Sequence, residues 1–255
     1  YNAGTFTMTG GRVGGKSLYT RVDENNKENA WGDYILFGSY PKTIKADGIT
    51  INERAIDDYG YYLGSDGARY AKVKAAPRMN TYVYSDGTTI VKDVEYYFKV
   101  EPIKWRILSE SNGEAILLAE DVLNANIPFY NTSSKRTINE ETIYANNYEY
   151  STIRAWLNSY NGTKYSVTDY SSFSAGDYQN NGFYNQAFSQ REKDIILTSV
   201  VNNSKITTDS SSNPYESNNT NDKIWMLSYK DAINSIYGFG TSAFNYEKTR
   251  KKLAT

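Results

Sequence analysis

Cysteine and histidine are both absent from the 255-residue sequence. Without cysteine the chain forms no disulfide and has no thiol nucleophile. Without histidine it cannot build a Ser-His-Asp or Cys-His hydrolase site, a His-ligated zinc site, or the usual general base near neutral pH. A cysteine-free chain fits both the cytosol and a bacterial surface, so this absence leaves the compartment open.

An excess of one charge is also missing, because 28 basic residues face 29 acidic ones and the one short basic run is Arg250–Lys252. Nucleic acid is therefore not an expected partner, since phosphate binding needs a concentrated positive face. No apolar stretch approaches the roughly 18–20 residues of a membrane span, so we expect this segment not to cross a membrane. No signal peptide precedes Tyr1, and we interpret the sequence as a mature fragment whose targeting sequence lies upstream.

Tyrosine is abundant: the chain has 25 Tyr against 9 Phe, within an apolar content of 39% and a mean hydropathy of -0.66. A chain of this length is long enough for a sizeable core. Much of its hydrophobic material carries a hydroxyl group, however, and tyrosine suits surfaces that are both adhesive and wet.

The first thirty residues differ from the rest. Residues 5–9 alternate between threonine and an apolar residue before two glycine pairs, which predicts a short strand and a tight turn. The stretch also resembles one rung of the glycine-rich repeats of bacterial surface proteins that stack into a parallel β-helix; a frayed terminal hairpin is the other interpretation. Residues 21–30 are polar and lack periodicity, so we predict a repeat rung and linker over 1–30 and a second domain over 31–255.

Strand patterns dominate after Trp31. A strand is predicted at about 33–40, closed by Pro41. Three Asp-Gly pairs, at 47–48, 66–67 and 86–87, predict hairpin turns. They lack the D-x-D-x-D-G spacing of a calcium loop, so no metal site is predicted there.

Residues 103–119 form the most regular pattern in the chain. Ile103, Trp105 and Ile107 share one face of a predicted strand, and Asn112-Gly113 is a hairpin turn. The second strand, 115–119, is apolar on both faces. It is therefore expected to be central in a sheet and covered on both sides.

Two or three helices are expected in the second half. One helix is predicted within 150–160, with Ser151 as its N-cap, and another within 188–201, which opens with the capping box Ser189–Glu192. A buried strand is predicted at Ile224–Leu227.

Ser228 follows that strand and is expected to cap a short helix, with Asp231 three residues later. The polar stretches between these elements, 161–185 and 202–221, are long. Loops of this length in a compact domain are usually functional or disordered.

Paired carboxylates offer the one route to catalysis that the composition leaves open. A glycosidase needs two acids roughly 5–10 Å apart. Neighbours in sequence such as Asp57-Asp58, Glu140-Glu141, and Asp93 with Glu95 rarely meet that geometry, so we interpret them as surface charges. No catalytic residue, metal or cofactor is predicted.

Aromatic residues among small polar ones mark residues 165–188 as a candidate recognition surface. Rigid rings supply contact area there, and serine, asparagine and glycine adapt to the ligand. Their other role would be to cover the neighbouring helix. The predicted ligand-binding residues are Tyr170, Phe173, Tyr178, Phe183 and Tyr184.

Four segments, 102–123, 150–158, 185–201 and 221–232, follow one another in the order of a known bacterial family. The chain resembles, over roughly 31–250, the domain family of unknown function 6273, found in surface and secreted proteins. The resemblance implies architectural roles for the matching positions, which are Trp105, Arg106, Arg154, Trp156, Leu157, Asn158, Ala187, Phe188, Leu227 and Ser228. It hands over no active site, because the family has no established reaction.

The resemblance also implies a fold similar to C-type lectins and formylglycine-generating enzymes. Family members continue into closing strands that are missing before Thr255, and the cysteine chemistry of those enzymes cannot apply here. We therefore expect an α+β domain, mainly antiparallel β with two or three short helices.

The leading hypothesis is a non-enzymatic binding or adhesion module, on the bacterial surface or secreted, with a glycan or protein ligand. The alternatives are a carboxylate-dependent hydrolase of polysaccharide or peptidoglycan, and a structural spacer. The sequence predicts no oligomeric state.

Overall fold

A seventeen-residue strand, β9 (Glu95–Ser111), organises the sheet. The structure is a computed structural model that describes residues 4–9, 12–13, 16–77, 82–84, 86–124, 127–129, 136–138, 140–160, 178–204 and 217–239. Within these residues nine strands form one sheet, with the order β15-β1-β10-β9-β8-β7-β6 and with β5 and β4 attached through β9. All the strand pairs in it are antiparallel. The expected α+β class with a mainly antiparallel sheet and short helices is confirmed.

The remaining strands of this sheet are short or of medium length. Their bounds are β1 (Gly4–Thr9), β4 (Thr20–Val22), β5 (Tyr34–Ile44), β6 (Ile51–Ile56), β7 (Tyr62–Gly64), β8 (Arg69–Lys74), β10 (Glu114–Ala119) and β15 (Trp225–Met226). Three two-stranded sheets pair β2 (Arg12–Val13) with β3 (Lys16–Ser17), β11 (Arg136–Ile138) with β12 (Glu141–Ile143), and β13 (Ser199–Val201) with β14 (Thr220–Asp222).

The hairpin of β9 and β10 agrees with the sequence pattern. Asn112 and Gly113 both have positive φ angles, of 53° and 79°, as a type I′ turn requires. β10 lies between β9 and β1, and its neighbours Leu117 and Leu118, which point to opposite faces, are 0% and 4% exposed. The prediction of a central strand covered on both sides is confirmed.

β5 does not end at Pro41, contrary to the sequence prediction. Pro41 lies inside the strand, opposite Val100, and the register shifts between Pro41 and Thr43. A bulge is a place where a strand tolerates proline, because an unpaired position there does not need the missing N–H group. The bulge therefore carries the strand past the residue that was expected to stop it.

A second register shift in β5, between Leu36 and Ser39, contains Gly38 with a φ angle of 68°. A Cβ atom at Gly38 would lie 2.5 Å from Cε1 of Phe188. Only glycine fits here, because both the left-handed backbone and the close approach of the ring exclude a side chain.

The helices are short. They are α1 (Thr152–Leu157), α2 (Phe183–Ala187), α3 (Gln190–Lys193), α4 (Tyr229–Ala232) and the 3-10 turn η3 (Ser235–Tyr237). The predicted caps at Ser151, Ser189 and Ser228 are confirmed, the last two as capping boxes with Glu192 and Asp231. None of the helices in the described part of the chain has the length and apolar character that a membrane span needs.

The helix predicted over 188–201 is wrong beyond its first turn. α3 ends at Lys193, and residues 199–201 form β13, which pairs with β14. The buried strand predicted at Ile224–Leu227 is likewise reduced to two residues in β15, although Ile224 itself is fully buried.

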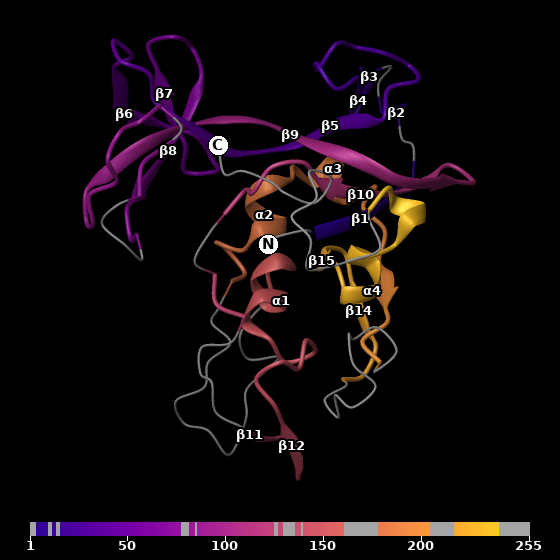
Figure 1. The fold of residues 1–255 in the computed structure, drawn as a ribbon. Helices are drawn as coiled ribbons and strands as arrows, with labels where there is room; N and C mark the ends of the chain where they lie inside the picture. Colours follow the sequence, from indigo (N-terminus) through magenta and orange to yellow (C-terminus); the bar gives the residue numbers. More distant parts are fainter. Residues whose placement is uncertain are drawn as a thin grey trace.

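The core lies between the sheet and the helices α1 to α3 (Figure 1). Its largest fully buried side chains include Trp105 of β9, Phe37 of β5 and Phe188. The Trp105 indole N–H donates to the carbonyl of Phe37 at 2.7 Å, which satisfies the ring's polar group inside the core. This hydrogen bond ties β9 to β5 within the core.

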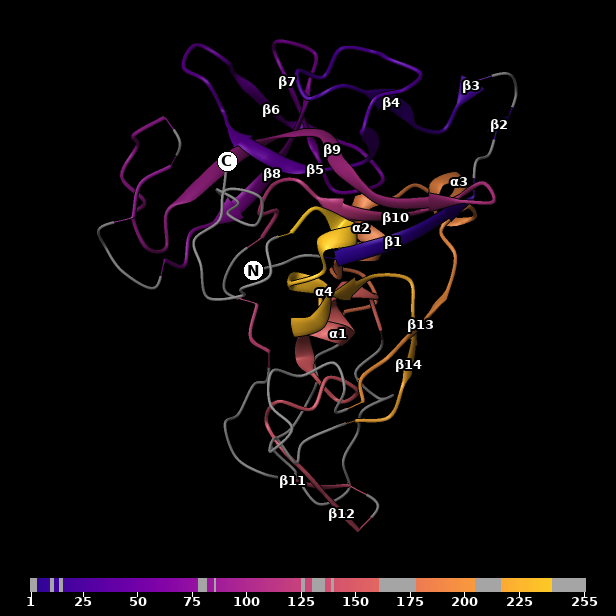
Figure 2. The same ribbon diagram turned by 45° about the vertical axis from the view of Figure 1, so that its right-hand side comes forward.

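The N-terminal strand β1 pairs with β10 and β15 within the large sheet (Figure 2). The domain boundary expected near residue 30 and the likeness to a β-helix rung remain predictions.

Candidate functional site

Three of the five aromatic residues expected to bind a ligand lie in the described part of the chain, and they pack inward. Phe183 is 3% exposed, with its ring centroid 5.6 Å from that of Trp156. Tyr178 and Tyr184 are half-buried and pack against the same core. The other two lie outside the described residues: Tyr170 and Phe173. The ligand-binding role of all five stays a prediction.

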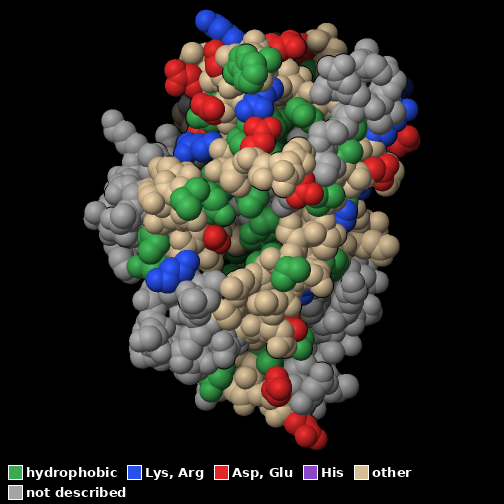
Figure 3. Space-filling view, turned by 90° about the vertical axis from the view of Figure 1, so that its right-hand side faces the viewer, with side chains coloured by type: hydrophobic (Ala, Val, Ile, Leu, Met, Phe, Trp, Pro, Cys, Tyr) green, Lys and Arg blue, Asp and Glu red, His purple; other side chains and the backbone are tan. Residues whose placement is uncertain are grey.

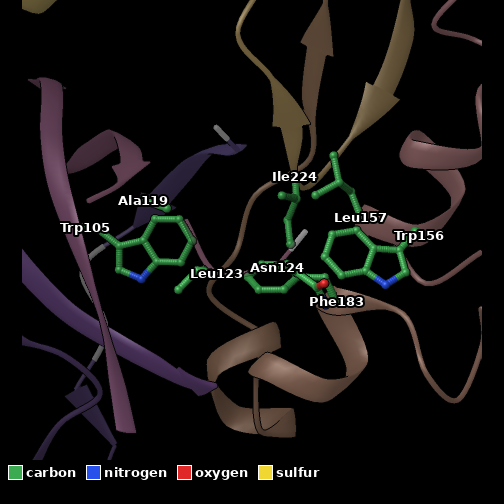
Figure 4. A pocket seen from close by; sticks show the side chains of 8 residues that line it. All are labelled: Trp105, Ala119, Leu123, Asn124, Trp156, Leu157, Phe183 and Ile224. Atoms are coloured by element: carbon green, nitrogen blue, oxygen red, sulfur yellow. The ribbon is translucent and has the colours of Figure 1, made fainter. Parts of the chain in front are cut away.

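A small apolar cavity lies beside Phe183, between β9 and α1 (Figure 4). Trp105 and Trp156 face it from opposite sides, and its polar lining group is the amide of Asn124, which donates to the Tyr40 hydroxyl at 2.9 Å. Its volume is about 20 Å³. That is room for roughly one water molecule, whereas small-molecule sites usually measure about 300–1,000 Å³. In this conformation the cavity is a packing gap rather than a ligand site.

The residues of the family motif in α1 hold the helix in place. Arg154 is 8% exposed, and its Nε donates to the carboxylate of the fully buried Asp222 at 2.8 and 3.0 Å. The hydroxyl of Thr220 donates to the same carboxylate at 2.6 Å, and that of Tyr160 at 3.3 Å. The buried charge is thus paired and hydrogen-bonded, as burial requires.

Asn158, at the end of α1, ties the helix to the chain after β14. Its Oδ1 accepts from the backbone N–H groups of Lys223 and Ile224, and its Nδ2 donates to the carbonyls of Ile224 and Arg154. Trp156 and Leu157 are 4% exposed in the core. The arginine, tryptophan, leucine and asparagine of the motif therefore all contact the interior.

Of the other motif positions, Phe188 lies in the core, Ser228 caps a helix and Arg106 lies nearer the surface. Phe188 is 1% exposed beneath Gly38, and Ser228 caps α4 directly after the half-buried Leu227. Arg106 forms a bidentate pair with Glu120 at 3.2 and 3.1 Å, near the surface of β9 and β10.

The paired carboxylates do not face one another across a described cleft. Asp57 accepts from the turn amides of Tyr59 and Tyr61, and Asp93 and Glu95 each pair with a lysine of β8. Among the described residues no group of three or more acidic side chains is arranged to hold a metal ion.

Exposed hydrophobic side chains gather in one part of the molecule. Of the eleven that are large and exposed in the described part of the chain, eight lie between residues 56 and 94. They are Ile56, Tyr59, Leu63, Val73, Tyr82, Val83, Val91 and Val94. We call β6, β7, β8 and residues 82–98, with the turns that join the three strands, the arm. Its strands extend to the upper left of Figure 1, beyond the helices that cover the other end of β9.

Two tyrosines of the turn before β7 form a cluster with an arginine at the start of β8. The rings of Tyr59 and Tyr61 are stacked, 6.4 Å apart and 15° from parallel. The Arg69 guanidinium lies 5.9 Å and 5.4 Å from their centroids and 3.3 Å from the Asp57 carboxylate. Tyr61 is buried, which raises the pKa of its hydroxyl to about 12. Tyr59, in contrast, is 51% exposed. Tyr59 is thus exposed to solvent, while its contacts with Tyr61 and Arg69 hold its ring in place.

One face of the arm is charged. Lys72 of β8 lies opposite Tyr97 of β9, and directly opposed residues share a face. Lys72 bridges Glu95 at 2.9 Å and Glu53 at 3.5 Å, and the Tyr97 hydroxyl donates to Glu53. The hydrogen bond from Tyr97 and the charge of Lys72 lower the pKa of Glu53, which keeps that carboxylate ionised and unsuited to act as a general acid.

The other face is aromatic and aliphatic. Tyr96 and Phe98 of β9 contact the Tyr84 ring edge-on, with centroids 5.1 and 5.3 Å apart. The Tyr96 hydroxyl donates to the carbonyl of Thr89 and accepts from the N–H of Val91. These contacts hold residues 82–84 and 86–91 against the sheet and leave Val83 and Val91 exposed.

On the face turned 90° from Figure 1, acidic and basic side chains intermingle and neither sign forms a broad field (Figure 3). Sequence reasoning assigned 51–98 to hairpins and gave it no function. The one signal available was the recurrence of tyrosine beside charged residues in 59–62 and 96–97. Alternation alone cannot say which face of a strand is covered, so the exposure of the arm could not be anticipated.

Comparison with family models gives one match, over residues 112–254, to the family described as Domain of unknown function (DUF6273). It includes α1 to α4 but begins later than the expected residue 31, so Trp105, Arg106 and the arm lie outside it. Searches of curated proteins and of solved structures found no match.

Proposed function

Because this chain belongs to the DUF6273 family, whose description names no reaction, we propose a function from its own surface: a non-enzymatic module that binds a protein ligand through the arm. The carrying observation is the concentration of eight exposed hydrophobic side chains within residues 56–94. Large exposed apolar patches on folded domains mark interaction sites.

The composition of the arm favours a protein ligand over a glycan. Tyrosine and arginine are the residues that most often dominate binding energy at protein interfaces, and Tyr59 and Arg69 present both at one point. The arm also presents four valines and a leucine that are exposed by 40% to 57%. Sugars stack on aromatic rings but gain little from aliphatic side chains, whereas a protein partner buries both.

The arm is also ordered before binding. The Tyr61 ring and the Asp57 carboxylate hold Arg69, and the contacts of Tyr84 with Tyr96 and Phe98 hold residues 82–84. A surface that is already fixed loses less conformational entropy when it binds. The arm lies before the matched residues 112–254, so this recognition would belong to this chain and not to the family as a whole.

The test measures binding of the full chain to a panel of immobilised extracellular-matrix proteins and, in parallel, to a glycan array. Tyr59→Ser and Val83→Ser should each weaken binding to a matrix protein, the tyrosine change by about 30-fold. Val200→Ser is the matched control, because Val200 is 71% exposed on β13, outside the arm. Binding to glycans alone, or equal effects of Val200→Ser and Val83→Ser, would overturn the proposal.

The setting and the finer fold are proposals of the same kind. We propose a bacterial surface or secreted location and a C-type-lectin-like fold, supported by the motif order shared with the family. Fractionation of the source cells tests the first, and an experimental structure compared with lectin domains tests the second. A cytoplasmic protein, or a sheet with different connectivity, would contradict them.

A further inference from the structure

Two lysines that lie outside the arm approach a single tyrosine ring. Tyr184 lies in α2, Lys193 ends α3, and Lys223 follows β14. Each ammonium nitrogen lies 5.4 Å from the centroid of the Tyr184 ring. The two charges are therefore separated by at most twice that distance, although they come from segments thirty residues apart in sequence.

Hydrogen bonds hold Lys223 and Tyr184 in place. Lys223 Nζ donates to the carbonyl of Ile196 at 2.8 Å, and its own N–H donates to Asn158 Oδ1. The Tyr184 hydroxyl donates to the carbonyl of Lys193 at 3.4 Å. The Lys223 ammonium is thus anchored, and the Tyr184 ring is tied to the backbone at the end of α3.

Neither lysine has a carboxylate at ion-pair distance among the described residues, in contrast to Lys42, which lies 2.8 Å from Asp121. Burial lowers the pKa of Lys193 and of Lys223. The nearby Asp194 favours the charged form of Lys223, but one of its oxygens accepts from Gln190 Nε2 at 2.8 Å. Both cations are thus partly desolvated, and Asp194 acts on Lys223.

We propose that Lys193, Lys223 and Tyr184 form a binding site for a compact oxyanion, a sulfate or phosphate group. An ammonium is a point charge with rotatable donors and suits a small multivalent anion, whereas planar carboxylates are better matched by arginine. An anion placed between the two cations would offset their mutual repulsion and their lost hydration. The site is separate from the arm and does not rest on the function proposed for it.

Calorimetric titration of the full chain with inorganic sulfate and with inorganic phosphate tests this site. Lys193→Gln and Lys223→Gln should each weaken anion binding by about tenfold or more, because each removes a charge-assisted hydrogen bond. Lys104→Gln is the matched control: the Lys104 ammonium lies 4.3 Å from the centroid of the Tyr34 ring and donates to the carbonyl of Glu24, and among the described residues no second lysine lies over that ring. The affinity of the Lys104→Gln variant for sulfate and phosphate should equal that of the unchanged chain.

A second measurement tests the site even where the heat of anion binding is too small for calorimetry. Limited acetylation followed by mass spectrometry should show that sulfate protects Lys193 and Lys223 but not Lys104. Glucose 6-sulfate and glucose 6-phosphate then distinguish the two sources of the anionic group. Absence of binding and protection at millimolar anion, or equal loss in the Lys104→Gln variant, would overturn the site and leave the arm untouched.

Discussion

Removing either partner of the buried pair Arg154 and Asp222 should destabilise the domain more than any surface change. The Asp222 side chain is fully buried and that of Arg154 is 10% exposed, so loss of one leaves the other charge without its partner. Breaking a buried pair in this way typically costs about 3–5 kcal/mol. We expect this range for Arg154→Met, because methionine keeps much of the arginine volume but removes the charge.

The double variant Arg154→Met/Asp222→Leu shows how much of the lost stability comes from leaving one buried charge unpaired. Replacing both charges with apolar groups of similar size is often nearly neutral, so the double variant should recover at least half of the stability lost by Arg154→Met. The recovery will not be complete, because the hydroxyls of Thr220 and Tyr160 lose their acceptor on Asp222.

Urea unfolding followed by circular dichroism measures these free energies of unfolding. Arg21→Met is the control, because Arg21 and Glu110 form a pair whose side chains are 27% and 48% exposed. It should cost less than about 1 kcal/mol. A cost below about 1 kcal/mol for Arg154→Met, or a double variant less stable than either single one, would refute the reasoning.

Three further outcomes are expected. Gly38→Ala should cost about 2–4 kcal/mol in urea unfolding, because it adds left-handed strain to a contact with Phe188; a loss below about 1 kcal/mol would show that the bulge relaxes. Glu192→Ala should cost about 1–3 kcal/mol, since its carboxylate accepts from the Ser189 N–H and hydroxyl and from the Gly38 N–H; a matched Asp194→Ala change should cost less. Burial raises the pKa of Tyr160 from 10.0 to about 12, so the contribution of Tyr160 to the stability of the fold is present below pH 10 and is lost as the pH rises through about 12. Thermal unfolding at a series of pH values, with tyrosinate absorbance as the probe of ionisation, measures this loss. Tyr160→Phe should make the loss of stability at high pH less steep.

Local features of the fold were predictable from the sequence. The turn at Asn112-Gly113 and the caps at Ser189 and Ser228 depend on residues within one turn of one another, and each formed as expected. Such signals carry their own backbone geometry and need no tertiary contact.

Features that depend on distant partners were not predictable. The apolar residues after Lys193 fit a helix, but residues 199–201 pair instead with 220–222, and β pairing of this kind overrides local propensity. Pro41 stayed in its strand because a bulge formed against Val100.

The candidate site shows the same division. The aromatic content predicted a binding role for Phe183 and Tyr184, which pack inward, whereas the exposed tyrosines are Tyr59 and Tyr82 of the arm. Burial is decided by how α2 packs on the sheet, and a list of residue types does not contain that information.

The seventeen-residue β9 belongs to both the arm and the core, and this has a mechanical consequence. Its residues 95–99 pair with β8, 98–106 with β5 and 105–111 with β10. Hydrogen bonds between antiparallel strands run perpendicular to the strands, so a pull along β9 loads many of them at once in shear. A partner that pulls on the arm would therefore transmit tension along β9 to the part of the core around Trp105. The neighbouring strands β8, β5 and β10 would share the load.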